Sequence, residues 1–151
     1  MVKDAYLYTG LKRKTRYFFV SEGENKRIVK MVVFTPLGKK LWNLGFGDLQ
    51  YHGYIDDSVV SNNDDLIKVI STVAKITYEF SEKYPLRHLQ IKPVDEKRRR
   101  LYNHVFRRNY DIIYANFEIT GINNLNGIIR EHYSPEETYN SFELKRRLNN
   151  G

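Results

Sequence analysis

The sequence predicts an α+β fold in which a single mixed, mainly antiparallel sheet carries two main helices within one domain, residues 1–151. Three stretches rich in β-branched and aromatic residues follow one another before residue 50. A stretch of about 20 residues then repeats apolar side chains at three- and four-residue spacing. A second helical pattern begins near residue 95 between short alternating segments, so the expected order is β-β-β-α-β-α-β-β.

The first two predicted strands form a hairpin. Residues 16–21 and 27–37 have the composition of strands, and the Gly and Asn of residues 22–25 favour a turn between them. Residues 41–49 alternate between two faces and predict a third strand. Gly45 and Gly47 stand at alternate positions in it, and glycine there often marks a ligand or another backbone close by.

Residues 63–84 predict the central helix of the core. Residues 61–65 offer Ser, Asn and Asp side chains that can cap its start, and acidic groups there suit the positive end of the helix dipole. Pro85 ends the segment. The apolar spacing predicts a buried face made of Leu66, Val69, Ile70, Val73, Ile76 and Phe80.

A second helix is predicted after a short strand at residues 88–92. Asp95 or Glu96 can open this helix, because an acidic side chain near the first turn both caps it and suits its dipole. The predicted buried stripe of the helix is Leu101, Tyr102, Val105 and Phe106.

The last third of the chain predicts two further strands. Residues 112–119 are rich in isoleucine and fit a strand. Residues 120–138 are rich in Asn and Gly and fit a loop. Residues 139–145 fit either a strand or a short helix, and we predict a strand that closes the sheet.

The composition excludes several classes of protein. Hydrophobic residues make up 41% and charged residues 28% of the chain, which is typical of a globular domain and not of a disordered or fibrous one. No cysteine is present, so disulfides, thiol nucleophiles and thiolate zinc sites are excluded. No apolar run reaches the ~18 residues that a membrane helix needs. We expect a cytoplasmic protein that does not bind membranes.

The net charge of +7 is concentrated in two basic blocks. Residues 1–50 carry ten basic and four acidic side chains, and residues 87–108 carry eight and two. Residues 51–86 and 109–151 are acidic. A clustered basic excess favours a polyanionic partner such as nucleic acid, although lysine and arginine on solvated faces also simply keep proteins soluble.

The second basic block supplies the candidate binding residues. At about 100° per residue, Arg98 falls within the apolar stripe of the second helix, whereas Arg99 and Arg100 point away from it. A guanidinium at the place of Arg98 must lie at the core edge, pair with a carboxylate or face a ligand. The others are better placed for phosphate contacts. The candidate nucleic-acid or anion-binding residues are Arg98, Arg99, Arg100, Arg107 and Arg108.

Four aspartates lie within ten residues before the central helix, at positions 56, 57, 64 and 65. Clustered carboxylates can hold a divalent cation, but their spacing lacks the glycine hinge and terminal glutamate of a calcium loop. The simpler interpretation is that Asn62 or Asn63 caps the helix and the aspartates complement its dipole. We expect no metal.

The four histidines show no spacing typical of a metal site or a catalytic triad. A small basic nuclease could still assemble its site from distant residues. His104 with Tyr102 and Arg107 is the local cluster that would serve one, and an exposed helix histidine is the alternative interpretation.

Several motifs together resemble an uncharacterised family found mainly in Bacteroidetes and known as a domain of unknown function. They are Asn43-Leu44-Gly45-Phe46-Gly47-Asp48, Asp56-Asp57, Ser61-Asn62-Asn63-x-Asp65, Thr72-Val73-Ala74 and Arg98-x-Arg100-Leu101-Tyr102. The resemblance spans nearly the whole chain. It marks a possible pocket lined by Asn43, Gly45, Gly47, Asp48, Asp57, Asn62, Asn63 and Tyr102.

The order of elements also looks like the later part of a Gcn5-related N-acetyltransferase. In those enzymes a glycine-containing turn opens the long helix, so that backbone N–H groups bind the pyrophosphate of coenzyme A. Residues 60–65 stand at that place here, without glycine and with two aspartates that would repel a pyrophosphate. We therefore expect acetyltransferase-like topology without the cofactor.

These observations favour a non-catalytic binding module for nucleic acid or a protein partner, in an accessory, defence or toxin–antitoxin role. An acyltransferase-like enzyme with a degenerate cofactor loop is the first alternative. A small basic nuclease is the second. No cofactor is expected in the favoured interpretation.

Overall fold

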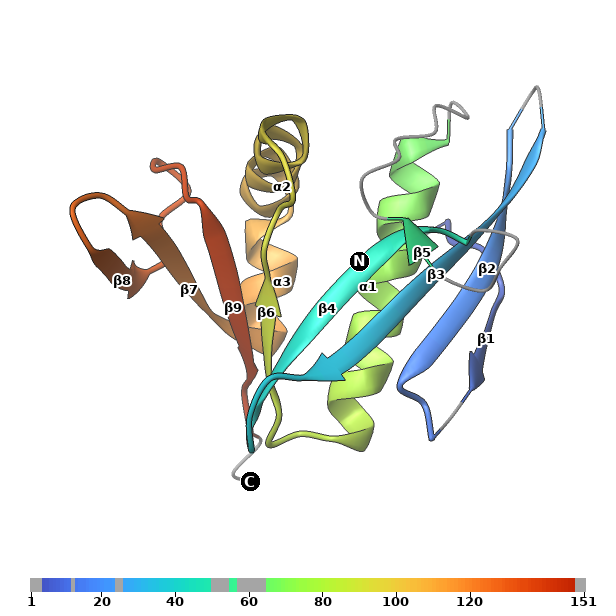
Figure 1. Ribbon diagram of the computed structural model, residues 1–151, viewed down its shortest axis with the longest axis horizontal. Coiled ribbons are helices and arrows are strands. Elements are labelled where there is room, and N and C mark those ends of the chain that lie inside the picture. The colour runs from blue at the N-terminus through green and yellow to red at the C-terminus, as the bar shows by residue number, and fades with distance from the viewer. Residues whose placement is uncertain (1–3, 12, 24–25, 50–54, 57–64, 149–151) are drawn as a thin grey trace. The chain divides into compact units, whose positions relative to one another are not determined.

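The structure is a computed structural model that describes residues 4–11, 13–23, 26–49, 55–56 and 65–148. In these residues, hydrogen bonds order the strands β1-β2-β3-β4-β6-β9-β7-β8, with β5 on β4 (Figure 1). Strand β4 pairs with β6 in parallel, whereas pairs such as β2–β3 and β6–β9 are antiparallel. The predicted α+β fold with one mixed sheet is therefore confirmed.

The described residues fall into two compact units, and β4 (Leu41–Leu49) contributes to both. The first unit comprises the described parts of Met1–Thr35 and Leu44–Tyr84. The second comprises Pro36–Asn43 and the described part of Pro85–Gly151. The parallel pairing of Leu41–Asn43 with β6 lies wholly within the second unit.

The first unit packs helix α1 on an antiparallel sheet. The rings of Phe34 and Phe80 stack at 3.9 Å between strand and helix, and Tyr17 and Phe19 are buried beside them. Its elements are β1 (Tyr8–Leu11), β2 (Arg16–Glu22), β3 (Arg27–Pro36), β4 from Leu44, β5 (Ile55–Asp56) and α1 (Leu66–Lys83).

Helix α1 buries a face that is rotated slightly from the predicted one. Val69, Ile76 and Phe80 are buried as expected. Ile70 and Val73 are only half-buried, and the side chain of Leu66 lies outside the described part. Three polar residues take the remaining buried positions, because each hydroxyl donates to a carbonyl oxygen three or four residues earlier in the helix. They are Thr72, Thr77 and Ser81.

The second unit places two helices on one face of its sheet (Figure 1). Phe106 of α2 stacks on Phe142 of β9 at 4.1 Å, and α3 contacts β7. Its elements are the start of β4, β6 (His88–Ile91), α2 (Glu96–Arg108), α3 (Tyr110–Asn116), β7 (Phe117–Asn124), β8 (Ile128–His132) and β9 (Ser141–Arg146).

The predicted strand at residues 112–119 is wrong in its first half. Residues Tyr110–Asn116 form helix α3, and β7 begins only at Phe117. The β-branched pair Ile112 and Ile113 favours a strand locally, but Tyr110 and Tyr114 are i,i+4 neighbours whose rings stack at 5.3 Å in the helix. That contact favours the helix over local strand propensity.

The predicted loop at residues 120–138 is also wrong in part. Strand β7 continues to Asn124, and β8 returns beside it as a hairpin. Asn126 and Gly127 both have positive φ in the turn. An Asn-Gly dipeptide between isoleucine-rich segments is the strongest local hairpin signal, so the sequence contained the information.

The other predicted elements agree with the structure to within three residues at their ends. The strand predicted at residues 139–145 is β9, and the helix predicted from Asp95 or Glu96 is α2. Strands β1 and β5 are additions to the prediction. Within the described part of the chain, no helix is both long and apolar enough to span a membrane.

Gly121 in β7 allows a close packing contact. A Cβ atom at this position would lie 2.3 Å from the ring of Tyr139, which is a distance that real Cβ atoms do not show. The ring of Tyr139 is 1% exposed and cannot move into solvent without leaving the core. Glycine is therefore required here to let the ring lie directly on the strand.

Candidate nucleic-acid interface

Helix α2 begins and ends at side chains that hydrogen-bond its backbone. Asp95 caps the start, where its Oδ1 accepts a hydrogen bond from the backbone N–H of Arg98 at 2.8 Å. Asn109 ends the helix, where both its backbone N–H and its side-chain amide donate to the carbonyl of Val105. These contacts define the length of α2 and therefore which basic residues belong to it.

The buried side of α2 fixes the rotation of the helix. Asn103 is 4% exposed and bonds both backbone groups of Tyr139: its Oδ1 accepts from the N–H at 2.8 Å, and its Nδ2 donates to the carbonyl at 2.9 Å. Phe106, one turn later, stacks on Phe142. With these two side chains held, the opposite side of α2 must face solvent.

Arg98 and Arg99 are both held by carboxylates of the same helix end. Arg98 is 8% exposed, and its Nη1 lies 2.6 Å from Asp95 Oδ2, so of the three expected outcomes the structure has the carboxylate pair. Arg99 donates two hydrogen bonds to Glu96, at 2.8 and 2.7 Å. This bond from Arg99 holds the pKa of Glu96 below its usual value. Both guanidinium groups already have an anionic partner.

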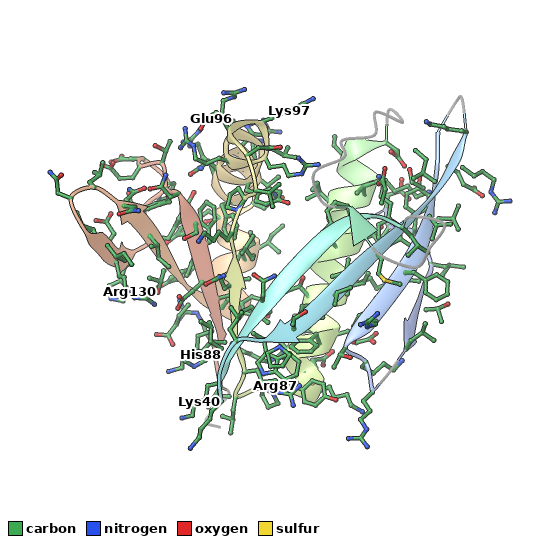
Figure 2. All side chains as sticks on the ribbon, in the orientation of Figure 1. Lys40, Arg87, His88, Glu96, Lys97 and Arg130 are labelled. Atoms are coloured by element: carbon green, nitrogen blue, oxygen red, sulfur yellow. The ribbon has the colours of Figure 1, made fainter. Side chains whose placement is uncertain are left out.

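The exposed side of α2 is almost entirely basic. After Glu96, every exposed residue of this helix is a lysine, arginine or histidine. At about 100° and 1.5 Å per residue they lie within an arc of about 100° along about 16 Å of helix. Figure 2 shows Glu96 and Lys97 at the amino-terminal end of α2. The five residues, here the basic face of α2, are Lys97, Arg100, His104, Arg107 and Arg108.

Carboxylates of the described residues neutralise little of the positive charge on the basic face. Arg100 lies 3.4 Å from Glu96, but its side chain is 66% exposed and Glu96 is already engaged by Arg99. Arg107 donates from Nε to the carbonyl of Pro135 at 2.9 Å, which orients the guanidinium without neutralising it. Among the described residues, the structure shows no ion pair for Lys97, His104, Arg107 or Arg108.

Arg99 belongs to a different surface from Arg100, Arg107 and Arg108. It lines a cavity of about 540 Å³ in the second unit, together with the ion pair between Arg130 and Glu143. The charged residues that line this cavity are balanced, three basic and three acidic, so the cavity does not select an anion. They are Lys92, Arg99, Arg130, Asp95, Glu96 and Glu143.

The structure does not bring together the local cluster proposed for a nuclease. On helix α2, Tyr102 lies about 160° from His104 around the helix axis and about 140° from Arg107. His104 is exposed, whereas Tyr102 is half-buried. His104 therefore shares a face of α2 with arginines. Tyr102, the other proposed member of the nuclease cluster, lies on a different face.

The residues of the predicted pocket have separate placements. Asn43 and Tyr102 belong to the second unit, and Asn43 accepts a hydrogen bond from Gln90 at 3.3 Å. Gly45, Gly47 and Asp48 belong to the first unit, whereas Asp57, Asn62 and Asn63 lie outside the described residues. The pocket stays a prediction.

Asp48 has a structural partner. Its carboxylate lies 2.5 Å from the ammonium of Lys30, and the two side chains are 11% and 7% exposed. Phe46 lies below the same ammonium, 5.9 Å from ring centroid to nitrogen. A charge pair this deeply buried persists only because each ion compensates the other.

Asp65 is the N-cap residue that precedes α1, and its side chain makes no capping bond to the helix. Its Oδ2 accepts instead from the hydroxyls of Tyr6 and Ser21, each at 2.5 Å. The predicted caps Asn62 and Asn63 lie outside the described residues. Within the part that the structure describes, no group of three or more His, Cys, Asp or Glu could hold a metal ion.

Lys97 and His104 were absent from the predicted binding set. Their positions follow from the same helical periodicity that places Arg100 and Arg108, because residues 97, 100, 104 and 108 are three or four apart. The predicted set contains only arginines, whereas the exposed side of the helix also carries this lysine and this histidine.

The strand order and the helices define an α+β protein with one mixed sheet, whose candidate site is the basic face of a helix. A family model for a family of unknown function (DUF6934) matches residues 2–147, and the chain belongs to this family. Searches of curated proteins and of solved structures found no match.

Proposed function

We propose that this protein is a non-catalytic module that binds nucleic acid through the basic face of α2. The observation that carries the proposal is that all exposed residues of the helix after Glu96 are basic and lie on one side. Polyanions are recognised by such stripes of lysine and arginine, whose electrostatic attraction does not depend on base sequence.

The geometry supports a quantitative expectation for salt dependence. Lys97, Arg100, Arg107 and Arg108 carry permanent charges, and each phosphate contact releases counterions from the nucleic acid. If all four make one contact, the log–log slope of affinity against salt is about −3.6 on duplex DNA and about −2.8 on single strands.

The test is fluorescence anisotropy with labelled DNA and RNA oligonucleotides across a salt series. The variant Lys97→Glu/Arg100→Glu/Arg108→Glu reverses three charges and keeps Arg107, which also holds Pro135. We expect it to bind at least about tenfold more weakly at low salt and to have a flatter salt slope.

The matched control reverses three exposed lysines elsewhere: Lys39, Lys75 and Lys83, each to Glu. It lowers the net charge by the same amount, so it should keep most of the affinity if the basic face is the site. Equal losses in both variants would reduce the effect to net charge. Absence of binding at low salt would overturn the proposal and favour a protein partner.

An acyltransferase-like enzyme is the second candidate. The specific observation for it is the order of elements, since an antiparallel strand run precedes α1 and the parallel strand β6, α2 and closing strands follow. Against it, Asp65 stands at the start of α1, where a pyrophosphate would need to lie.

Calorimetry with acetyl-coenzyme A separates the two candidates. We expect no micromolar dissociation constant, because acidic residues and no glycine occupy positions 61–65. A micromolar constant that is lost in Asn63→Trp would establish the cofactor site and favour the enzyme.

A further inference from the structure

Three tyrosines of the second unit form a row that ends at a half-buried arginine, Arg147. The ring of Tyr110 stacks on Tyr133 at 5.6 Å and on Tyr114 at 5.3 Å, with interplanar angles of 29° and 28°. The guanidinium carbon of Arg147 lies 4.1 Å from the ring centroid of Tyr114. Tyr133 is buried, whereas Tyr114 is 48% exposed, so the row leads from the core to the surface.

The aromatic row begins where the basic face of α2 ends. Tyr110 opens α3 two residues after Arg108, and its ring packs on Tyr133. Arg107 bonds the carbonyl of Pro135, which follows Tyr133 by two residues. A strand of nucleic acid that follows α2 past Arg108 would therefore continue onto α3, where Tyr114 is the exposed member of the row.

Two hydrogen bonds hold Arg147 where its guanidinium lies over the ring of Tyr114. Its backbone N–H donates to the carbonyl of Asn116 at 2.9 Å, and its Nε donates to the carbonyl of Tyr114 at 2.6 Å. The structure shows no ion pair for Arg147 among the described residues. The guanidinium thus lies over a tyrosine ring, and among the described residues no carboxylate pairs with its terminal nitrogens.

An arginine plane supported by an aromatic ring is a surface on which a nucleobase stacks. The rest of α3 agrees, because none of its residues is buried and Tyr114 itself is 48% exposed. Duplex DNA or RNA hides the faces of its bases within the helix stack, whereas unpaired bases expose them.

We infer that the ligand is single-stranded nucleic acid, with its phosphates on the basic face of α2 and a base stacked on the Arg147–Tyr114 platform. The inference rests on the proposed function and adds to it the strandedness of the ligand and a second contact region. Base stacking tolerates any sequence, so the affinity should vary little with base composition.

The experiment compares three 12-nucleotide probes with equal phosphate numbers per strand: oligo-dT, the corresponding duplex, and an abasic strand with the same backbone. Oligo-U is included to compare RNA with DNA. We expect oligo-dT and oligo-U to bind about tenfold more tightly than the abasic strand. Tyr114→Ala and Arg147→Ala should lose this preference and keep their affinity for the abasic strand apart from the one charge removed by Arg147→Ala.

Arg147→Lys keeps the charge and removes the plane, so it should lose the preference for bases and retain the salt slope. Tyr114→Phe keeps the ring and should behave as the unmodified protein. The matched control is Arg27→Ala, which removes an arginine that is 74% exposed and paired with Glu22 in the first unit. Circular dichroism melts establish that each variant is folded.

The outcomes separate this inference from the proposed function. Equal affinity of the unmodified protein for abasic and base-containing strands, or tighter binding of the duplex, would overturn the single-strand inference and leave the basic face as the site. A preference for bases that survives in Tyr114→Ala and Arg147→Lys would overturn the platform. Absence of binding to every probe would overturn the proposed function itself.

Discussion

Helices α1 and α2 are alike on their buried sides and different on their exposed sides. Each places a phenylalanine flat against a strand phenylalanine: Phe80 on Phe34 at 3.9 Å, and Phe106 on Phe142 at 4.1 Å, both with an interplanar angle of 9°. The exposed residues of α1 described by the structure are mixed: Ile67, Ala74, Lys75, Glu82 and Lys83. Those of α2 after Glu96 are all basic.

Solvation alone does not require the pattern on α2. A helix that packs on a sheet with one face needs only polar residues of either sign on the other, and α1 meets that requirement. The four lysine and arginine side chains on one side of α2 repel one another unless an anion lies against them. The difference between the two helices therefore identifies the basic face of α2 as a feature that the fold itself does not require.

The largest expected effect is on the free energy of unfolding, through the phenylalanine stacking that both helices share. Phe80→Ala and Phe106→Ala should each lower the free energy of unfolding by about 3–5 kcal/mol, because each leaves a cavity under a helix. Urea unfolding followed by circular dichroism measures both. Losses that differ by more than about 2 kcal/mol would contradict the equivalence of the two packing contacts.

The second prediction compares the buried cations of the two units. Asp48→Ala removes the carboxylate that pairs with the buried ammonium of Lys30 and should cost about 3–5 kcal/mol, whereas Lys30→Met/Asp48→Leu should recover most of the loss. Asp95→Ala removes a cap and the partner of Arg98, and should cost about 2 kcal/mol. The same urea titrations test this order, and a larger loss for Asp95→Ala would contradict it.

The third prediction concerns the pH dependence of stability that comes from a hydrogen-bonded tyrosine next to each helix, Tyr8 at α1 and Tyr139 at α2. Tyr8 donates to Glu79 of α1 at 2.8 Å, and Asn103 of α2 holds the backbone of Tyr139. Burial, together with a hydrogen bond to Glu131, raises the pKa of Tyr139 to about 12. Burial and the bond to Glu79 likewise raise the pKa of Tyr8.

Because the folded state keeps Tyr139 protonated, its stabilisation is present below about pH 10 and is lost as the pH rises towards 12. Tyr139→Phe should therefore be about 1–2 kcal/mol less stable at pH 8, and the difference should shrink at pH 11.5. Urea unfolding at the two pH values measures it. A difference that stays constant would show that the hydroxyl does not titrate with folding.

The smallest expected effect sharpens the comparison of the exposed sides. Glu82→Lys on α1 raises the net charge by the same amount that Arg108→Glu on α2 lowers it. If position decides binding, Arg108→Glu should weaken oligonucleotide affinity by about threefold or more, and Glu82→Lys should change it by less than about twofold. Equal and opposite changes would indicate that net charge alone governs binding.

The periodic parts of the fold were predictable from the sequence. The three strands before residue 50 alternate visibly, and α1 and α2 repeat their apolar residues at helical spacing. The same arithmetic placed Arg98 on the buried side of α2, where the structure has it. Asp95 was one of two predicted starts of that helix, and it is the cap.

Features that depend on tertiary contacts were harder to predict. The helical state of Ile112 and Ile113 follows from the stacking of Tyr110 between Tyr114 and Tyr133, and Tyr133 lies far along the chain. The placement of Arg147 on Tyr114 likewise depends on β9 returning beside β7. Local secondary-structure propensity predicts neither of these contacts, because each joins residues that are far apart in the chain. The hairpin at Asn126 and Gly127, in contrast, was present as a turn signal and was missed.

The close contact between Gly121 and Tyr139 has an evolutionary consequence. Since no Cβ fits beneath the ring, a mutation that adds a side chain at position 121 can become fixed only when position 139 first becomes small. Reversion of position 139 alone is then blocked in the same way, whereas position 121 can still return to glycine. We expect the two positions to covary across the family and to record the order in which substitutions occurred.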